Sequence, residues 1–253
     1  MLNTTIEPML HLVQSLMTAP ASVEVFFPLW AVIVYVISLF YGLFFLWSGF
    51  NFMISGYDTA KRENAKVWLR NVVLMIIFVQ GSFLLYSLII ELSSMLTAGM
   101  ISIIDPNFFL MTADNITNFG LQLMFLMTYI GVLAITILIL AMRYLAVIIG
   151  VVFFPLGIFF YFIPPLQSYG KMVLNVLLVL IFVPFLDAVL LFGASALMTI
   201  PLFDNVKIMV STMAFLSVDL LMILLLVFAI VKAAFSVLNS DVGRGVKMAA
   251  KLL

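Results

Sequence analysis

Residues 144–171 read YLAVIIGVVFFPLGIFFYFIPPLQSYGK, an apolar stretch that is long enough to cross a membrane but contains several residues that disturb a helix. These residues are Pro155, Gly157 and the pair Pro164-Pro165. Proline removes a backbone hydrogen bond, and non-helical backbone at membrane depth is stable only where protein or a water-filled cavity covers it. The stretch is therefore expected either to turn back within the membrane as a re-entrant hairpin or to cross it as a kinked helix.

The rest of the chain is also strongly apolar, with 66% hydrophobic and 9% charged residues. Soluble domains carry about 25% charged residues, and a membrane-spanning helix needs about 20 predominantly apolar ones. Five further segments meet that length, and they are residues 25–57, 71–90, 115–142, 172–203 and 208–231. The sequence therefore predicts an all-α, polytopic membrane helical bundle.

The distribution of lysine and arginine decides between the two forms of residues 144–170, because these residues favour the cytoplasmic side of a membrane. The loop 58–70 holds Lys61, Arg62, Lys66 and Arg70, whereas the residues before 25 hold none, which places this loop inside and the N-terminus outside. Six full crossings would divide the eleven basic residues into six inside and five outside. A re-entrant segment leaves only Lys207 outside. We therefore expect five full spans plus a Pro-interrupted re-entrant hairpin, with six spans as the alternative.

The same layout divides the chain into three regions. Residues 1–24 form an extracytoplasmic, interfacial amphipathic segment, because their apolar side chains fall on one helical face; packing of that face against a partner subunit is an equal alternative. Residues 25–238 form the membrane domain, and residues 239–253 form a basic cytoplasmic tail. The sequons at Asn3 and Asn115 both fall outside, so they are candidate glycosylation sites in a host that has the machinery.

No pattern in the sequence predicts catalysis. Cysteine is absent, His11 is the single histidine, and no Gly-rich phosphate loop or metal-ligand spacing occurs. We therefore expect a protein that is not an enzyme and that has no cofactor and no metal site.

Two aspartates lie inside predicted spans, where an ionised aspartate costs at least about 2.5–3.5 kcal/mol. Asp187 and Asp219 lie roughly 21 and 12 Å from the loop that joins their helices, so they could face each other. Pro184 leaves the carbonyl of Leu180 without its amide partner. These residues, with Gln80, are the candidates for a polar path inside the membrane, and hydrogen bonding between helices is their alternative role.

Two stretches resemble a known family. They are GYDTAKRENAKVWLRN at residues 56–71 and MRYLAVIIGVVFFPLGIFFYFIPPLQSYGKM at residues 142–172. In the placement of their prolines and basic residues they resemble the TrbL-type family of polytopic inner-membrane components of type IV secretion and conjugation machines, which has archaeal relatives in the CedA-like DNA-transfer systems. The resemblance covers roughly residues 40–200.

This resemblance implies a non-enzymatic channel or platform subunit of the cytoplasmic (inner) membrane, surrounded by membrane lipids and assembled as a homo-oligomer. It further implies a conjugation-type ATPase, a pilin and a coupling ATPase as partners, with DNA as a cargo. The cytoplasmic surfaces for docking them are Lys61, Arg62, Lys66 and Arg70 in the first loop and Arg244 and Lys247 in the tail. The alternatives are a proton-coupled small-solute transporter that binds its ion at the two aspartates, and a structural assembly factor of a surface filament.

Overall fold

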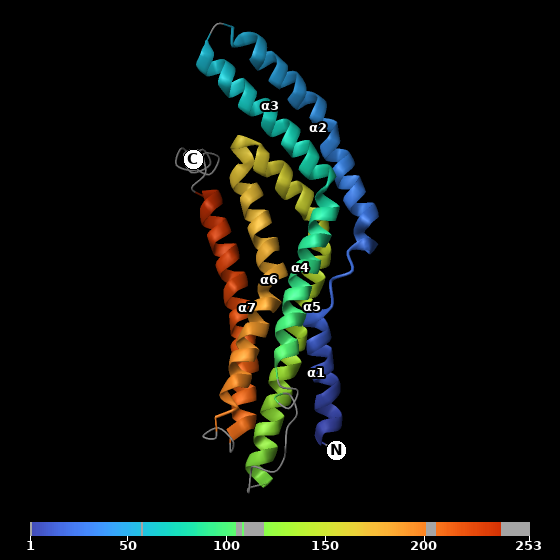
Figure 1. The fold of residues 1–253 in the computed structure, drawn as a ribbon, viewed down its shortest axis with the longest axis vertical. Helices are drawn as coiled ribbons and strands as arrows, with labels where there is room; N and C mark the ends of the chain where they lie inside the picture. The colour runs from blue at the N-terminus through green and yellow to red at the C-terminus, as the bar shows by residue number, and fades with distance from the viewer. Residues whose placement is uncertain (1, 57, 105–107, 109–118, 201–205, 239–253) are drawn as a thin grey trace, which may run out of the picture. The chain divides into compact units, whose positions relative to one another are not determined.

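The computed structural model describes residues 2–56, 58–104, 108, 119–200 and 206–238, and every regular element in these ranges is a helix. In chain order they are α1 (Leu2–Thr18), η1 (Glu24–Phe26), α2 (Phe27–Ile54), α3 (Thr59–Gln80), α4 (Ser82–Ile103), α5 (Phe119–Phe162), η4 (Pro164–Leu166), α6 (Gln167–Leu197) and α7 (Lys207–Leu238) (Figure 1). The all-α prediction is confirmed. Asn115, Arg244, Lys247 and the tail 239–253 lie outside the described residues, and the side chain of Asn3 is not described.

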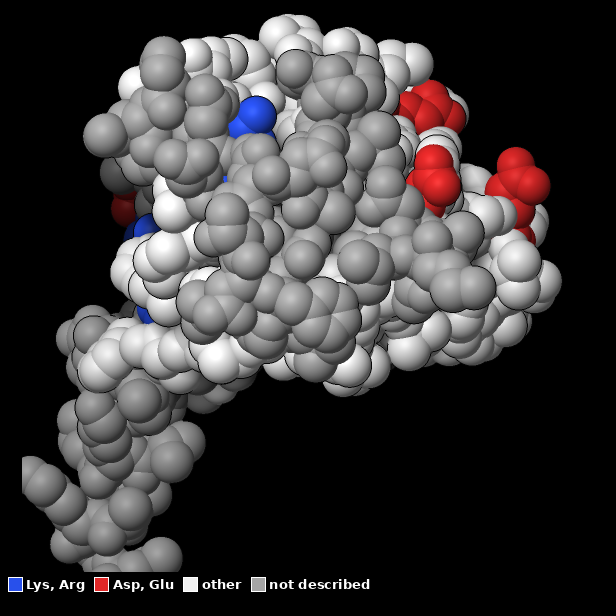
Figure 2. Space-filling view, turned by 90° about the horizontal axis from the view of Figure 1, so that it is seen from below, with Lys and Arg blue, Asp and Glu red and all other residues white. Residues whose placement is uncertain are grey.

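Within these ranges, five stretches are long and apolar enough to cross a membrane. They are Glu24–Ile54, Ser82–Ile103, Met124–Phe162, Pro164–Leu197 and Lys207–Lys232. On the face seen in Figure 2, most of the described surface belongs to uncharged residues, with a few acidic and basic side chains. The prediction of a polytopic membrane bundle is confirmed, and the number of described helices that are long and apolar enough to cross equals the five full spans expected.

The boundaries of the second span differ from the prediction. Residues 71–90 are not one helix, because α3 ends at Gln80 and α4 begins at Ser82. The Gly81 amide still donates to the Ile77 carbonyl (2.9 Å), and the Gly81 carbonyl accepts from the Leu85 amide (3.0 Å). The apolar helix of this region is therefore α4, and it ends at Ile103, beyond the predicted end of the span at residue 90.

Residues 144–170 do not form a separate hairpin. Helix α5 is 44 residues long and continues through Pro155, so it contains both the predicted span 115–142, from Phe119 onward, and the first arm of the expected hairpin. The chain reverses later, where Ile163 is extended (ψ 112°) before Pro164. A single proline removes one hydrogen bond from a helix, whereas the residue before a proline is driven out of the helical region. Here the pair Pro164-Pro165 ends the helix and Pro155 does not.

The chain divides into two compact units. Unit 1 comprises Met1–Ala21, Ile89–Val147 and Val179–Phe228, and unit 2 comprises Ser22–Leu88, Ile148–Leu178 and Ala229–Leu253. Helices α4, α5, α6 and α7 therefore each contribute one part to each unit.

Helix α1 belongs to unit 1 and buries its apolar face there. Ile6, Leu10, Val13 and Met17 are between 1% and 5% exposed and join the hydrophobic core of α5, α6 and α7. The amphipathic pattern of residues 1–24 predicted a surface on the outer leaflet or against a partner subunit. In the structure, helices of the same chain cover the apolar face of α1 instead. This burial removes the apolar side chains from water, as a lipid surface or a partner subunit would.

Unit 2 contains the α2–α3 hairpin, in which the two helices lie side by side and antiparallel (Figure 1). The reversal depends on Gly56, which has a positive φ of 44°, and on Asp58, which caps α3 by accepting from the amides of Ala60 (3.1 Å) and Lys61 (3.3 Å). Glycine adopts the left-handed conformation without steric cost, and aspartate is a preferred N-cap. These two residues flank the turn of the sequence motif 56–71.

Candidate functional site

The candidate site is a charged centre inside unit 1, and it is built around Pro184 of α6. Because proline has no amide hydrogen, the Leu180 carbonyl cannot accept its usual helical bond. Arg143 of α5 fills this place, since its Nε donates to the Leu180 carbonyl (2.7 Å) and its Nη2 to the Ile181 carbonyl (3.2 Å). The Ile181 carbonyl also accepts from the Ser93 hydroxyl of α4 (2.7 Å). Side chains of two helices thus satisfy α6 next to its proline.

The two aspartates lie at this centre. Asp187 follows Pro184 by about one helical turn and is fully buried, and Asp219 of α7 is 6% exposed. Arg143 and Asp219 are both close enough to Asp187 for their charges to act on its carboxyl group. The charges of Asp219 and Arg143 thus both act on Asp187, while the direct facing of the two acids stays a prediction.

Neither carboxyl group makes a hydrogen bond with the described part of the protein. The Thr136 side chain of α5 lies beside Asp219, but its hydroxyl donates to the Val132 carbonyl of its own helix (3.1 Å). Elsewhere on α5, seven residues before Thr136, the Tyr129 hydroxyl is also buried without a partner among the described residues, while its ring packs against Phe215 (6.0 Å between centroids). The centre thus contains carboxyl oxygens that could accept hydrogen bonds but find no donor among the described side chains.

The charges of the centre do not balance. The three helices contribute two carboxyl groups and one arginine, and that arginine acts on Asp187. Neighbours of the acids such as Ala188, Val218 and Met222 belong to the hydrophobic core of unit 1. Charges interact strongly in such surroundings, and an uncompensated buried charge is costly. Chemically, the arrangement suits the uptake and release of one further positive charge, either a proton or a monovalent cation.

Arg143 was predicted only to lie inside, as one of the basic residues other than Lys207, and its role at the centre was not predicted. A signal was available, because Arg143 is flanked on both sides by long segments without acidic residues. An arginine inside an uninterrupted apolar helix needs a partner on another helix. Gln80, which was grouped with the acids, is the last residue of α3 and lies next to Tyr41 within unit 2.

The predicted docking residues Lys61, Arg62, Lys66 and Arg70 are all exposed on α3. Lys61 pairs with Asp58 (3.5 Å) and Lys66 with Glu63 (3.5 Å), on side chains that are 46–69% exposed. Surface pairs of this kind contribute about 0–1 kcal/mol. These side chains therefore remain available to a ligand or a partner.

Neither a protein-family model, nor a curated protein, nor a solved structure matches this chain.

Proposed function

We propose that this chain is an integral membrane channel or platform subunit of a type IV secretion-like apparatus for conjugation or DNA transfer. The observation that carries the translocation role is the centre formed by Arg143, Asp187 and Asp219, which lie on three helices of an apolar bundle. Ionisable residues at such positions are costly and typically mark a transport pathway. The resemblance of residues 56–71 and 142–172 to the TrbL-type family supports the class of apparatus.

On this proposal the chain is not an enzyme, and energy comes from a conjugation-type ATPase that works with a pilin and a coupling ATPase. The exposed basic side chains of α3 suit docking to partners on the cytoplasmic side. Large apolar side chains such as Leu39, Leu46 and Met53 of α2 are more than 60% exposed. Lipid or further copies of the chain would cover them in a membrane assembly.

The proposed orientation places the N-terminus outside and the C-terminus in the cytoplasm of the inner membrane. It predicts that cysteines introduced at Thr59 and Ala250 react with a membrane-impermeant maleimide only after the cells are permeabilised, and that a cysteine at Thr199 reacts in intact cells. The chain has no cysteine of its own, so each variant carries a single reporter. Labelling of the Ala250 position in intact cells would contradict this orientation.

The second candidate is a proton-coupled small-solute transporter. It is favoured by the carboxyl groups of Asp187 and Asp219, which have no hydrogen-bond partner among the described residues and suit binding of a coupling ion. The two functions differ in what the acids must do: a transporter needs them to exchange a cation in every cycle, whereas a platform needs them only for a hydrated interior.

The double variant Asp187→Asn/Asp219→Asn separates these functions, because it removes both negative charges and keeps the size of the side chains. For a platform we expect the variant to co-purify with its ATPase and pilin as the wild type does, and a purified wild-type chain to carry no proton flux in proteoliposomes. Glu63→Gln, which neutralises an exposed acid on α3, is the control. Proton flux by the wild type that the double variant abolishes would replace the platform by the transporter.

A further inference from the structure

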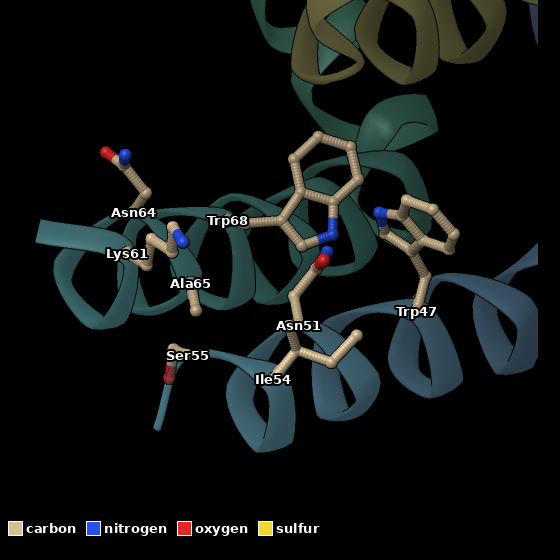
Figure 3. Close-up of a pocket in the computed structure, with 8 residues that line it drawn as sticks. All are labelled: Trp47, Asn51, Ile54, Ser55, Lys61, Asn64, Ala65 and Trp68. Carbon is tan, nitrogen blue, oxygen red and sulfur yellow. The ribbon is translucent and has the colours of Figure 1, made fainter. Parts of the chain in front are cut away.

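A polar pocket and an apolar groove adjoin each other on the α2–α3 hairpin of unit 2. The pocket has a volume of about 310 Å³, and its polar lining comes from both helices (Figure 3). Asn51 and Trp47 are one turn apart on α2, while Lys61, Asn64 and Trp68 follow one face of α3. The two faces meet because α2 and α3 are antiparallel.

The groove has a volume of about 700 Å³ and is lined only by apolar and aromatic residues, among them Leu43, Leu46 and Phe50. Trp47 and Trp68 line both the groove and the pocket. The two indoles therefore mark a border between a polar compartment and an apolar one. Tryptophan is enriched at this kind of border, at the interface between headgroups and hydrocarbon.

The pocket is rich in donors. The Nε1 hydrogen of Trp68 is buried and has no acceptor in the described part of the chain. Figure 3 shows the Asn51 amide and the Trp68 indole pointing toward one another across the pocket. Lys61 adds an ammonium group, and none of the lining residues is acidic. A buried donor without an acceptor costs about 1–3 kcal/mol, so a ligand that brings acceptor oxygens would be stabilised here.

The charge of this region also favours an anion. The whole chain is neutral, but residues 58–70 contain four basic and two acidic residues, which leaves an excess of two positive charges. Phosphate oxygens suit lysine, amide and indole donors, and charge-assisted bonds of this kind are the strong ones. Phosphate alone, however, makes no use of the apolar groove that the same two tryptophans line.

We propose that the α2–α3 hairpin binds an anionic phospholipid, with its phosphate in the polar pocket and an acyl chain in the groove. Both compartments are then occupied by one molecule, and Trp47 and Trp68 contact the glycerol region between them. The site does not depend on the proposed role in DNA transfer, because it uses only residues of unit 2.

Tryptophan quenching tests this site in the full chain. In the Trp30→Phe background the only remaining indoles are Trp47 and Trp68. We expect dibrominated phosphatidylglycerol, added to phosphatidylcholine nanodiscs, to quench them more strongly than dibrominated phosphatidylcholine at the same mole fraction. The titration is made in roughly 1 M salt, where the Debye length is about 3 Å and general surface attraction is screened.

Two variants and one control identify the residues. Lys61→Gln is expected to lower the apparent affinity for phosphatidylglycerol about tenfold, as for the loss of one hydrogen bond to a charged group. Asn51→Leu leaves the charge of the chain unchanged, and it is expected to reduce the preference for phosphatidylglycerol over phosphatidylcholine. Lys66→Gln removes the same charge from the same helix at an exposed position that does not line the pocket, and should leave the affinity unchanged.

Three results would overturn the proposal. Equal quenching by the two lipids would mean that the site does not recognise an anionic headgroup. If Lys61→Gln and Lys66→Gln lose the same affinity for phosphatidylglycerol, then the preference for this lipid is a general electrostatic attraction to the basic surface of α3. Relief of quenching by glycerol phosphate at the concentration at which phosphatidylglycerol acts would assign the pocket to a soluble phosphate ester and leave the groove without a role. Lys61 is exposed, so its variant is expected to fold even if Asn51→Leu does not.

Discussion

Replacement of Arg143 by glutamine is expected to destabilise the protein by about 1.5–3 kcal/mol, because it removes hydrogen bonds that a charged side chain donates to carbonyls of α6. The guanidinium group has two roles, hydrogen-bond donation and charge compensation. It donates to the Leu180 and Ile181 carbonyls (2.7 and 3.2 Å), and it supplies positive charge close to the fully buried Asp187. The thermal unfolding midpoint of the purified chain in detergent measures the loss.

Two further variants separate hydrogen-bond donation from charge, and a third is the control. Arg143→Lys keeps the charge but not the planar, two-point donation, so its loss should be smaller than that of Arg143→Gln. The double variant Arg143→Gln/Asp187→Asn removes both charges and should recover part of the stability. Arg70→Gln changes an exposed arginine of α3 and should alter stability by no more than about 0.5 kcal/mol. If the double variant is as unstable as Arg143→Gln alone, then Arg143 and Asp187 are not coupled and the charged centre is not a unit.

The Gly170→Ala variant is expected to destabilise unit 2 by about 1–3 kcal/mol through overpacking. Gly170 lies near the start of α6, and a Cβ atom at this position would collide with the backbone of Tyr161 and with the carbonyl of Gly157 in α5. These atoms belong to a helix backbone and cannot move aside as a flexible side chain can. The absence of a side chain therefore allows α5 and α6 to pack closely after the turn at Pro164-Pro165.

Gly193→Ala provides the matched control on the same helix, because a Cβ atom there would meet nothing within 4 Å. Alanine is the better helix former, so this variant should gain up to about 1 kcal/mol. Thermal unfolding of the two variants should thus shift in opposite directions. If both variants shift the thermal unfolding midpoint equally, then the close approach of Gly170 to α5 is not what makes Gly170→Ala destabilising.

Much of the α2–α3 hairpin could be predicted from local residues. Gly56 and Asp58 stand between an apolar segment and a basic one, and the structure uses them as a left-handed turn residue and as an N-cap. Both roles depend on the backbone within a few residues, so they can be inferred without knowledge of the rest of the fold. The pocket beside the turn could not, because its lining combines faces of two helices.

The different effects of Pro155 and Pro164 on helix α5 could not be predicted from the nearby residues alone. Pro155 and Pro164 both lack an amide hydrogen, yet α5 continues through the first and ends before the second. The adjacent Pro165 and the extended Ile163 distinguish the second site. Taken together, the prolines of residues 144–170 predicted one interrupted hairpin.

By itself, the sequence determined that this protein is a helical, multi-pass membrane protein, because apolar composition and segment length are properties of single helices in lipid. It also identified Asp187 and Asp219 as the costly residues. Only the tertiary structure decided that Arg143 lies near Asp187 and donates a hydrogen bond to the Leu180 carbonyl that Pro184 leaves free. It likewise decided that α1 is covered by its own chain. These features depend on contacts between residues 37 or more positions apart, and such contacts are set by packing between helices, which no local pattern encodes.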